Sequence, residues 1–213
     1  MFHQLIRRPQ RGAGFTLVEL MIGLAVLGSL LAIGIPAMGD WMMASKARAA
    51  GEFYLDGFAT ARRQAVSHNS SSRIVLTTNE SSGQMNWQVD ICFDRPGTAC
   101  NDTTGSWSTI DAPAANDPQG DAGYRSVFRS ADALPPSEIL APVITPEGAT
   151  EVYYTALGWV NTAVPLRLTQ LRLNPDASLA RQIPVVALSI TLAGMPSKCN
   201  PTLAASDSRA CPP

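Results

Sequence analysis

The stretch Gly14-Phe15-Thr16-Leu17-Val18-Glu19-Leu20-Met21 opens an apolar run that continues to Gly39 and contains a single charged residue, Glu19. An apolar run of about 20 to 25 residues crosses a bilayer as a helix. The preceding residues 1–14 include three arginines and no acidic residue. Because basic residues stay on the cytoplasmic side of a membrane span, we expect residues 1–14 in the cytoplasm and the chain after Asp40 outside it.

The order of the basic and apolar segments is unusual for a secreted protein. An ordinary secretory signal places its apolar stretch before the cleavage site, so the stretch is discarded. Here the basic leader ends in Ala13-Gly14 and the apolar stretch follows. Together with residues 14–21, this order resembles the signal of type IV prepilins and type II secretion pseudopilins. The resemblance implies that a prepilin peptidase cuts between Gly14 and Phe15 and that the new Phe15 amine is methylated.

Glu19 is the one acidic residue in the apolar run. A carboxylate in the hydrocarbon region costs roughly 2.5 to 3.5 kcal/mol even on the lenient insertion scale, so it needs a partner. The resemblance implies that this partner is the Phe15 amine of the neighbouring subunit, and that the pair sets the axial register of assembly. The alternative interpretation is a plain single-pass anchor with Glu19 near the membrane surface.

Beyond Asp40, apolar residues recur at helical spacing and predict an amphipathic helix that ends near Ser67. With the apolar run, this helix would be roughly 80 Å long at 1.5 Å per residue. We expect an interruption or kink at Gly34-Ile35-Pro36, because proline removes a backbone donor. The stripe on the second half is predicted to pack against the rest of the protein; its aromatic members are Trp41, Tyr54 and Phe58.

Residues 70–213 change to a period of two, which is typical of half-buried strands. The clearest examples are residues 85–93 and 186–192. A long helix followed by strands predicts an α+β fold, with the helix packed on an antiparallel sheet. The predicted parts are a leader at 1–14, a transmembrane and assembly helix at 15–39, an amphipathic stem at 40–69 and a β-rich head at 70–213. Within the head, residues 94–123 predict a long exposed loop, either partner-facing or without a role.

The four cysteines form two close pairs, a spacing that suits two short disulfide loops in an oxidising compartment. They are Cys92, Cys100, Cys199 and Cys211. Four cysteines allow three connectivities, and all three stay open at this point. A Cys199–Cys211 disulfide would close a C-terminal loop at 199–211. The spacing matches no usual zinc site, so we expect neither a metal nor another cofactor.

The composition argues against catalysis and against a general attraction to nucleic acid. Sixteen basic and 17 acidic residues give a net charge of −1. After cleavage His68 is the one remaining histidine, and the chain has no phosphate-binding glycine loop. We therefore expect no enzyme activity. The rival class is a membrane-tethered hydrolase or binding protein with an unrecognised site.

Three segments are similar to the FimT, FimU and GspH group of minor pilins and pseudopilins: residues 59–66, 90–92 and 154–160. This resemblance implies a minor pilin that primes assembly or forms part of the pilus tip, for motility, adhesion or DNA uptake. Its partners would be the prepilin peptidase, other minor and major pilins and the inner membrane, and its head would be periplasmic before reaching the cell surface. A GspH-like pseudopilin of type II secretion is the alternative, although a cysteine-closed C-terminal loop favours the pilus.

DNA binding is a separate hypothesis that the same resemblance raises. Some FimT proteins bind DNA through an arginine-rich motif near the C-terminus, and phosphate contacts require clustered cations. This chain departs from that pattern, since Lys198 and Arg209 are the cations in the corresponding region. Few phosphates could be neutralised there.

Overall fold

The computed structural model describes residues 15–212. It contains one long helix, α1 (Leu17–His68), then eight strands and a short 3₁₀ helix, η1 (Gly120–Ala122). The chain divides after Asp40 into two compact units. The described part of the first unit is helical from Leu17, and the second unit, which begins at Trp41, holds every strand.

The helix is continuous across Gly34-Ile35-Pro36. The interruption predicted there is therefore not present, because the loss of one backbone donor does not by itself end a helix. A bend at Pro36 stays a prediction.

The C-terminal end of α1 is closed by a Schellman motif. Asn69 adopts a positive φ of 47°, its N–H donates to the Val66 carbonyl at 3.3 Å, and the Ser70 N–H donates to the Ala65 carbonyl at 3.1 Å. Asparagine tolerates this left-handed conformation better than most residues, which explains why the helix stops at His68. The polar cluster after the stem thus ends the helix within one residue of the predicted position.

Two four-stranded antiparallel sheets make up the head, where one sheet was predicted. The first sheet has the order β3-β2-β1-β5, with bounds Val127–Arg129, Met85–Cys92, Ser71–Thr78 and Glu151–Tyr154. The second has the order β4-β6-β7-β8, with bounds Leu140–Thr145, Gln170–Pro175, Val186–Ile190 and Pro196–Cys199. The sequence did not predict β8, whose four residues lack an alternating pattern.

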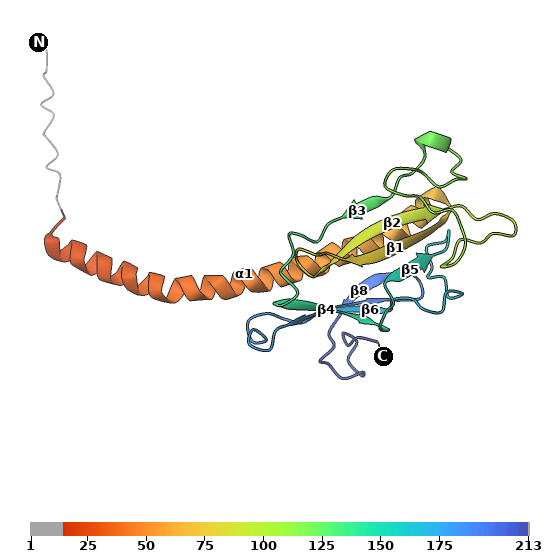
Figure 1. The fold of residues 1–213 in the computed structure, drawn as a ribbon. Helices are drawn as coiled ribbons and strands as arrows, with labels where there is room; N and C mark the ends of the chain where they lie inside the picture. Colours follow the sequence, from red (N-terminus) through yellow and green to blue (C-terminus); the bar gives the residue numbers. More distant parts are fainter. Residues whose placement is uncertain (1–14, 213) are drawn as a thin grey trace, which may run out of the picture. The chain divides into compact units, whose positions relative to one another are not determined.

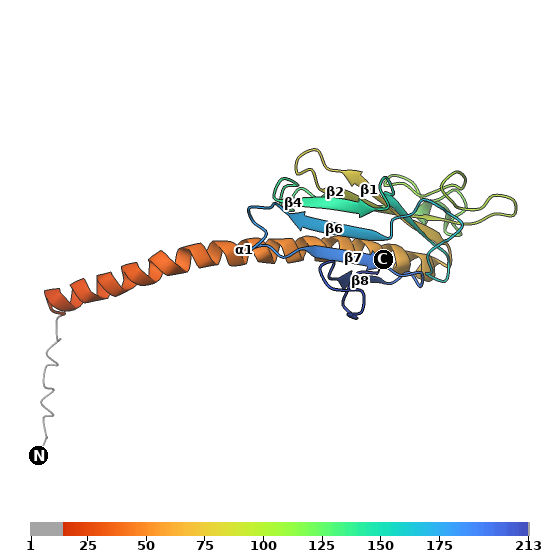
Figure 2. The same cartoon turned by 90° about the horizontal axis from the view of Figure 1, so that it is seen from below.

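Both sheets pack on the second half of α1. Figure 1 shows β1 and β2 along this part of the helix, and Figure 2 shows β6 and β7 along it. The stripe Ala47, Ala50, Tyr54, Phe58, Ala61 and Ala65 is buried against the strands. Gly57 faces the first sheet, where an added Cβ would lie 3.0 Å from the Ile74 and Trp87 side chains, and Gly51 faces Val186 of the second. The predicted α+β fold, with its long N-terminal helix on antiparallel strands, is confirmed.

Trp41 does not follow the rest of the stripe. Its side chain is 65% exposed, whereas Tyr54 and Phe58 are fully buried. The prediction that Trp41 packs in the core is wrong, because strand cover over the helix begins one turn later, at Ala44.

Residues 94–123 form a largely exposed loop that is held at a few points to the first sheet. The Cys92–Cys100 disulfide closes a small hairpin in which Arg95 and Thr98 exchange backbone hydrogen bonds of 3.1 and 2.9 Å. Farther along, Ser108 donates its N–H to the Ile91 carbonyl at 2.8 Å. The loop is therefore anchored by covalent and hydrogen bonds although it lacks strands.

An ion pair lies under this loop on the outer face of the first sheet. The Arg73 Nε donates to Asp90 Oδ2 at 2.9 Å, Gln88 donates to the other carboxylate oxygen at 2.7 Å, and Trp107 stacks over the guanidinium at 4.6 Å. Burial of the guanidinium works against its charge, but the hydrogen bond and attraction to Asp90 raise the pKa of Arg73 overall. Asp90 lies on the outer face of the sheet, but its side chain is only 1% exposed because it is covered by this group.

Candidate functional site

The N-terminal end of α1 is built around a reciprocal pair of hydrogen bonds. Thr16 precedes the first helical residue, and its Oγ1 accepts from the Glu19 N–H at 3.2 Å. Glu19 Oε2 in turn accepts from the Thr16 N–H at 3.5 Å. This is a capping box, in which a threonine and a glutamate three residues later satisfy free N–H groups of the first turn. Thr16 has a role that the sequence reasoning missed, although the Thr-x-x-Glu spacing is a readable signal for it.

Glu19 keeps one carboxylate oxygen available. Only Oε2 takes part in the cap, and Oε1 makes no hydrogen bond with any residue in the described range 15–212. The positive end of the helix dipole also stabilises a negative charge at this position. A local role in the helix cap and a second role toward another chain are therefore chemically compatible.

The surface around Glu19 is apolar and uncovered. Every residue from 15 to 35 is exposed, including Phe15 at 83%. A shallow hollow beside the carboxylate is lined by Phe15, Glu19, Leu20, Gly23 and Leu24. An added Cβ at Gly23 would meet no atom within 4 Å, so the missing side chain leaves this hollow open. α1 is long and apolar enough to cross a membrane.

Residues 9–35 match the family model of the prokaryotic N-terminal methylation motif. This chain is a type IV pilin- or pseudopilin-like protein. No curated protein and no solved structure gives a match. The motif and the apolar helix fit membrane anchoring of a pilin and a substrate of prepilin peptidase, and pilin-like proteins are generally non-enzymatic.

The predicted cleavage site spans the edge of the described structure. Gly14 and the leader at 1–14 lie outside the described residues, so cutting after Gly14 and methylation of Phe15 stay predictions. Phe15 itself lies two residues before α1.

Both predicted disulfides are present, with the pairing Cys92–Cys100 and Cys199–Cys211. The second closes a loop that returns over the outer face of the second sheet, where Gln170 Nε2 lies 3.9 Å from Cys199 Sγ. This cover explains why Gln170 and Ser189 are buried on a face that the strand pattern leaves polar.

The cations considered for DNA contact each have a carboxylate partner. Lys198 forms an ion pair with Glu52 of α1, and Arg209 donates two hydrogen bonds to Asp207, at 2.9 and 3.1 Å. The structure does not bring Lys198 and Arg209 into one unpaired cluster. Attraction to a phosphate there would compete with these internal partners.

The remaining candidates for chemistry are isolated. His68 accepts or donates hydrogen bonds at the helix end, to Ser67 and the Gln64 carbonyl, and its ring lies 5.1 Å from that of Tyr124. Across the described residues no group of three or more histidine, cysteine or acidic side chains could hold a metal ion.

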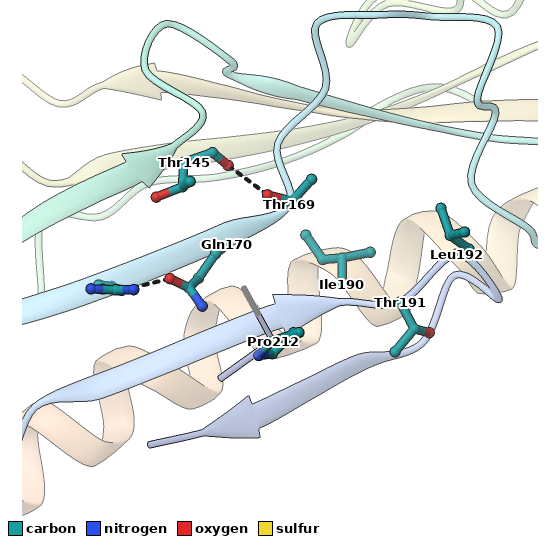
Figure 3. A pocket seen from close by; sticks show the side chains of 8 residues that line it. Thr145, Thr169, Gln170, Ile190, Thr191, Leu192 and Pro212 are labelled. Atoms are coloured by element: carbon teal, nitrogen blue, oxygen red, sulfur yellow. Dashed lines mark hydrogen bonds between the residues drawn. The ribbon is translucent and has the colours of Figure 1, made fainter. Parts of the chain in front are cut away.

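A hollow lies on the second sheet of the head. Figure 3 shows Thr145, Gln170 and Ile190 near the ends of β4, β6 and β7, with Pro212 of the C-terminal tail beside them. The Thr169 hydroxyl donates to the Thr145 carbonyl at 3.1 Å. The hollow is lined by threonines, aliphatic residues, proline, Gln170 and Arg172, so it offers no general base beside a nucleophile.

Buried tyrosines give the head its strongest shifts in acidity. Burial raises the pKa of Tyr54 to about 12, although the Met85 N–H that donates to its oxygen at 2.9 Å acts in the opposite direction. Burial also raises the pKa of Tyr154, which Arg62 partly offsets. These groups stabilise the core and do not form a reactive site.

Proposed function

We propose that this chain is a minor subunit of a type IV pilus, cut between Gly14 and Phe15 and then packed into the filament through α1. The observation that carries the proposal is the uncovered apolar segment 15–35, whose single carboxylate, Glu19, sits one turn from the predicted new N-terminus. Such a surface is stable only in a bilayer or against other apolar helices. A charge at that position needs a counter-ion, and the Phe15 amine of a neighbouring chain supplies one.

Two independent features support a periplasmic head. The arginines of the leader favour a cytoplasmic N-terminus, and two disulfides favour an oxidising compartment. The exposure of Trp41, directly after the apolar run, suits the bilayer interface, where tryptophan is enriched. In this proposal Trp41 lies at the periplasmic interface of the inner membrane before the chain is assembled.

A role in priming or in the tip complex fits a head with a disulfide-closed tail and a long anchored loop, and this favours the pilus over the secretion pseudopilus. DNA binding is not part of the proposal, because Lys198 and Arg209 already have carboxylate partners.

The test combines processing with location. In cells expressing the full chain, intact mass should correspond to a chain that begins with methylated Phe15, and sheared surface filaments should contain it. Gly14→Ala should leave the precursor in the inner membrane. A mature-sized Gly14→Ala protein, or a leader still attached to purified wild-type material, would overturn the cleavage hypothesis. Absence from sheared filaments together with co-purification with a secretion complex would make the chain a GspH-like pseudopilin.

A further inference from the structure

Five large apolar side chains, each more than half exposed, lie on three segments of the head that meet in space. They come from the turn after β5, from the turn between β7 and β8 and from the last helical turns of α1. We call them the apolar patch: Val66, Leu157, Trp159, Leu192 and Met195, with exposures of 51, 73, 61, 63 and 57%. A side chain of this kind is normal when isolated, but a contiguous group marks an interaction site.

Close backbone contacts hold the two turns together. The Val160 N–H donates to the Leu192 carbonyl at 3.0 Å. An added Cβ at Gly194 would lie 2.0 Å from the Gly158 carbonyl oxygen, and one at Gly158 would lie 2.8 Å from a Val66 methyl. Both glycines have positive φ, 77° and 76°, so no other residue fits easily at either position. The three segments of the patch therefore meet at this pair of glycines.

Each turn is also closed within itself. Thr155 donates its N–H to the Trp159 carbonyl at 2.8 Å, and Thr191 donates its N–H to the Met195 carbonyl at 3.1 Å. A surface that is already ordered loses little conformational entropy when a partner binds. The patch is thus preformed.

The charge beside the patch is positive and comes from α1. Residues 155–166 and 182–197 contain no charged side chain. Arg62 reaches the first turn, where its Nε donates to the Gly158 carbonyl at 3.2 Å. Its terminal nitrogens make no hydrogen bond or ion pair with other residues in the described part of the chain. They can bind a carboxylate from outside, with both atoms of the guanidinium fork.

This composition favours a protein partner of a different sequence. Tryptophan, methionine and arginine are enriched in the cores of protein interfaces. Anionic membranes are recognised by several basic residues around an apolar surface, whereas this patch has one half-buried arginine. Symmetrical pairing of two copies through the patch would offer Arg62 no carboxylate, because neither turn contains an acidic residue.

We propose that the apolar patch docks on the head of a neighbouring, non-identical filament subunit that presents apolar side chains around a carboxylate for Arg62. This rests on the proposed function. A surface patch of a monomer typically offers about 300 to 600 Å² of apolar area. That is less than the roughly 800 Å² per partner of a stable free complex. The contact therefore acts between subunits whose helices already hold them in one assembly.

The test uses the full chain in its own cells, with Leu192 replaced by the photo-crosslinker p-benzoylphenylalanine. The matched control carries the crosslinker at Ile110, which is 51% exposed in the 94–123 loop. We expect an adduct from position 192 with one other protein, identified by mass spectrometry, that has its own N-terminal methylation motif. Position 110 should give none. Trp159→Ala should lower the adduct at least tenfold, because an exposed tryptophan at such a site is a binding hot spot.

Four outcomes would overturn the proposal: a lipid adduct, an adduct with a second copy of this chain, an adduct with a protein lacking the motif, or no adduct. A second crosslinker position, Met195, covers the case in which the first variant does not fold. Failure of the proposed function looks different, since the wild-type chain would then be missing from filaments. If the chain is a filament subunit but the patch does not bind a neighbour, Trp159→Ala enters filaments at wild-type levels. The crosslinker at position 192, with Trp159 intact, then gives no adduct with another subunit.

Discussion

Replacing Glu19 by glutamine separates the two roles of this side chain. Glutamine keeps the size of glutamate and can still accept the Thr16 N–H in the capping box, but it removes the negative charge. If Glu19 pairs with the Phe15 amine of a neighbour, Glu19→Gln leaves that amine unpaired in an apolar environment. Thr16→Ala is the matched control, because it removes the threonine half of the cap and leaves the charge in place.

The expected effect follows from the surroundings of Glu19. The flanking Leu20 and Leu24 offer no polar partner, and the 15–35 segment has no basic residue. An uncompensated charge costs roughly 2.5 to 3.5 kcal/mol at the bilayer centre. Glu19 is near the end of its helix, so we take a lower value of about 2 kcal/mol, which corresponds to about a 30-fold loss of incorporation. Loss of the cap costs about 1 kcal/mol, or about fivefold.

Quantitative immunoblots give the measurement, as the ratio of chain in sheared filaments to total processed chain in the cell. Normalising to processed chain keeps any effect on cleavage out of the comparison. Glu19→Gln should reduce the ratio several times more than Thr16→Ala does. Wild-type incorporation of Glu19→Gln would refute the pairing argument, and an equal or larger loss in Thr16→Ala would assign Glu19 to the helix cap alone.

Three further predictions concern the head. Tyr154 is buried and its hydroxyl has no hydrogen-bond partner among the described residues, so Tyr154→Phe should be neutral or stabilising in urea unfolding. Tyr54→Phe should cost about 1 to 3 kcal/mol, because it removes the partner of the Gln84 Oε1 and of the Met85 N–H. Replacing Cys199 and Cys211 by serine should lower the free energy of unfolding by about 3 kcal/mol, as expected for a 13-residue loop, and an unchanged urea midpoint would contradict this. The pKa values of Tyr54 and Tyr154 are raised in the folded state, so their contribution to stability is complete below pH 10 and is lost as the pH rises toward about 12. Phenolate absorbance and circular dichroism should therefore change together. Phenolate absorbance from every tyrosine already at pH 10 would contradict this prediction.

The sequence was sufficient for the features that depend on local pattern. The apolar run with its one acid, the helical stripe from Ala47 to Ala65 and the two close cysteine pairs each led to the structure observed. In these cases one physical effect dominates: burial of one helix face, or the short span between cysteines.

Features that depend on distant parts of the chain could not be predicted in the same way. Asp90 is buried because Trp107 and Arg73 meet over it, and the local sequence pattern does not predict that contact. Trp41 fits the helical stripe, but no strand covers that turn of the helix. The apolar patch likewise combines turns from two different sheets, which only the folded chain brings together at Gly158 and Gly194.

The small hairpin between Cys92 and Cys100 offers a practical handle on this molecule. Its tip is solvent-facing, an added Cβ at Gly97 would meet no atom within 4 Å, and the covalent link fixes its base at a Cα separation of 6.0 Å. A short epitope inserted after Pro96 would project from the head, and the Cys92–Cys100 disulfide would keep the base of the hairpin closed. Fluorescent labelling there would allow microscopists to follow single subunits on living cells while the N-terminal end and its neighbours' contacts stay untouched.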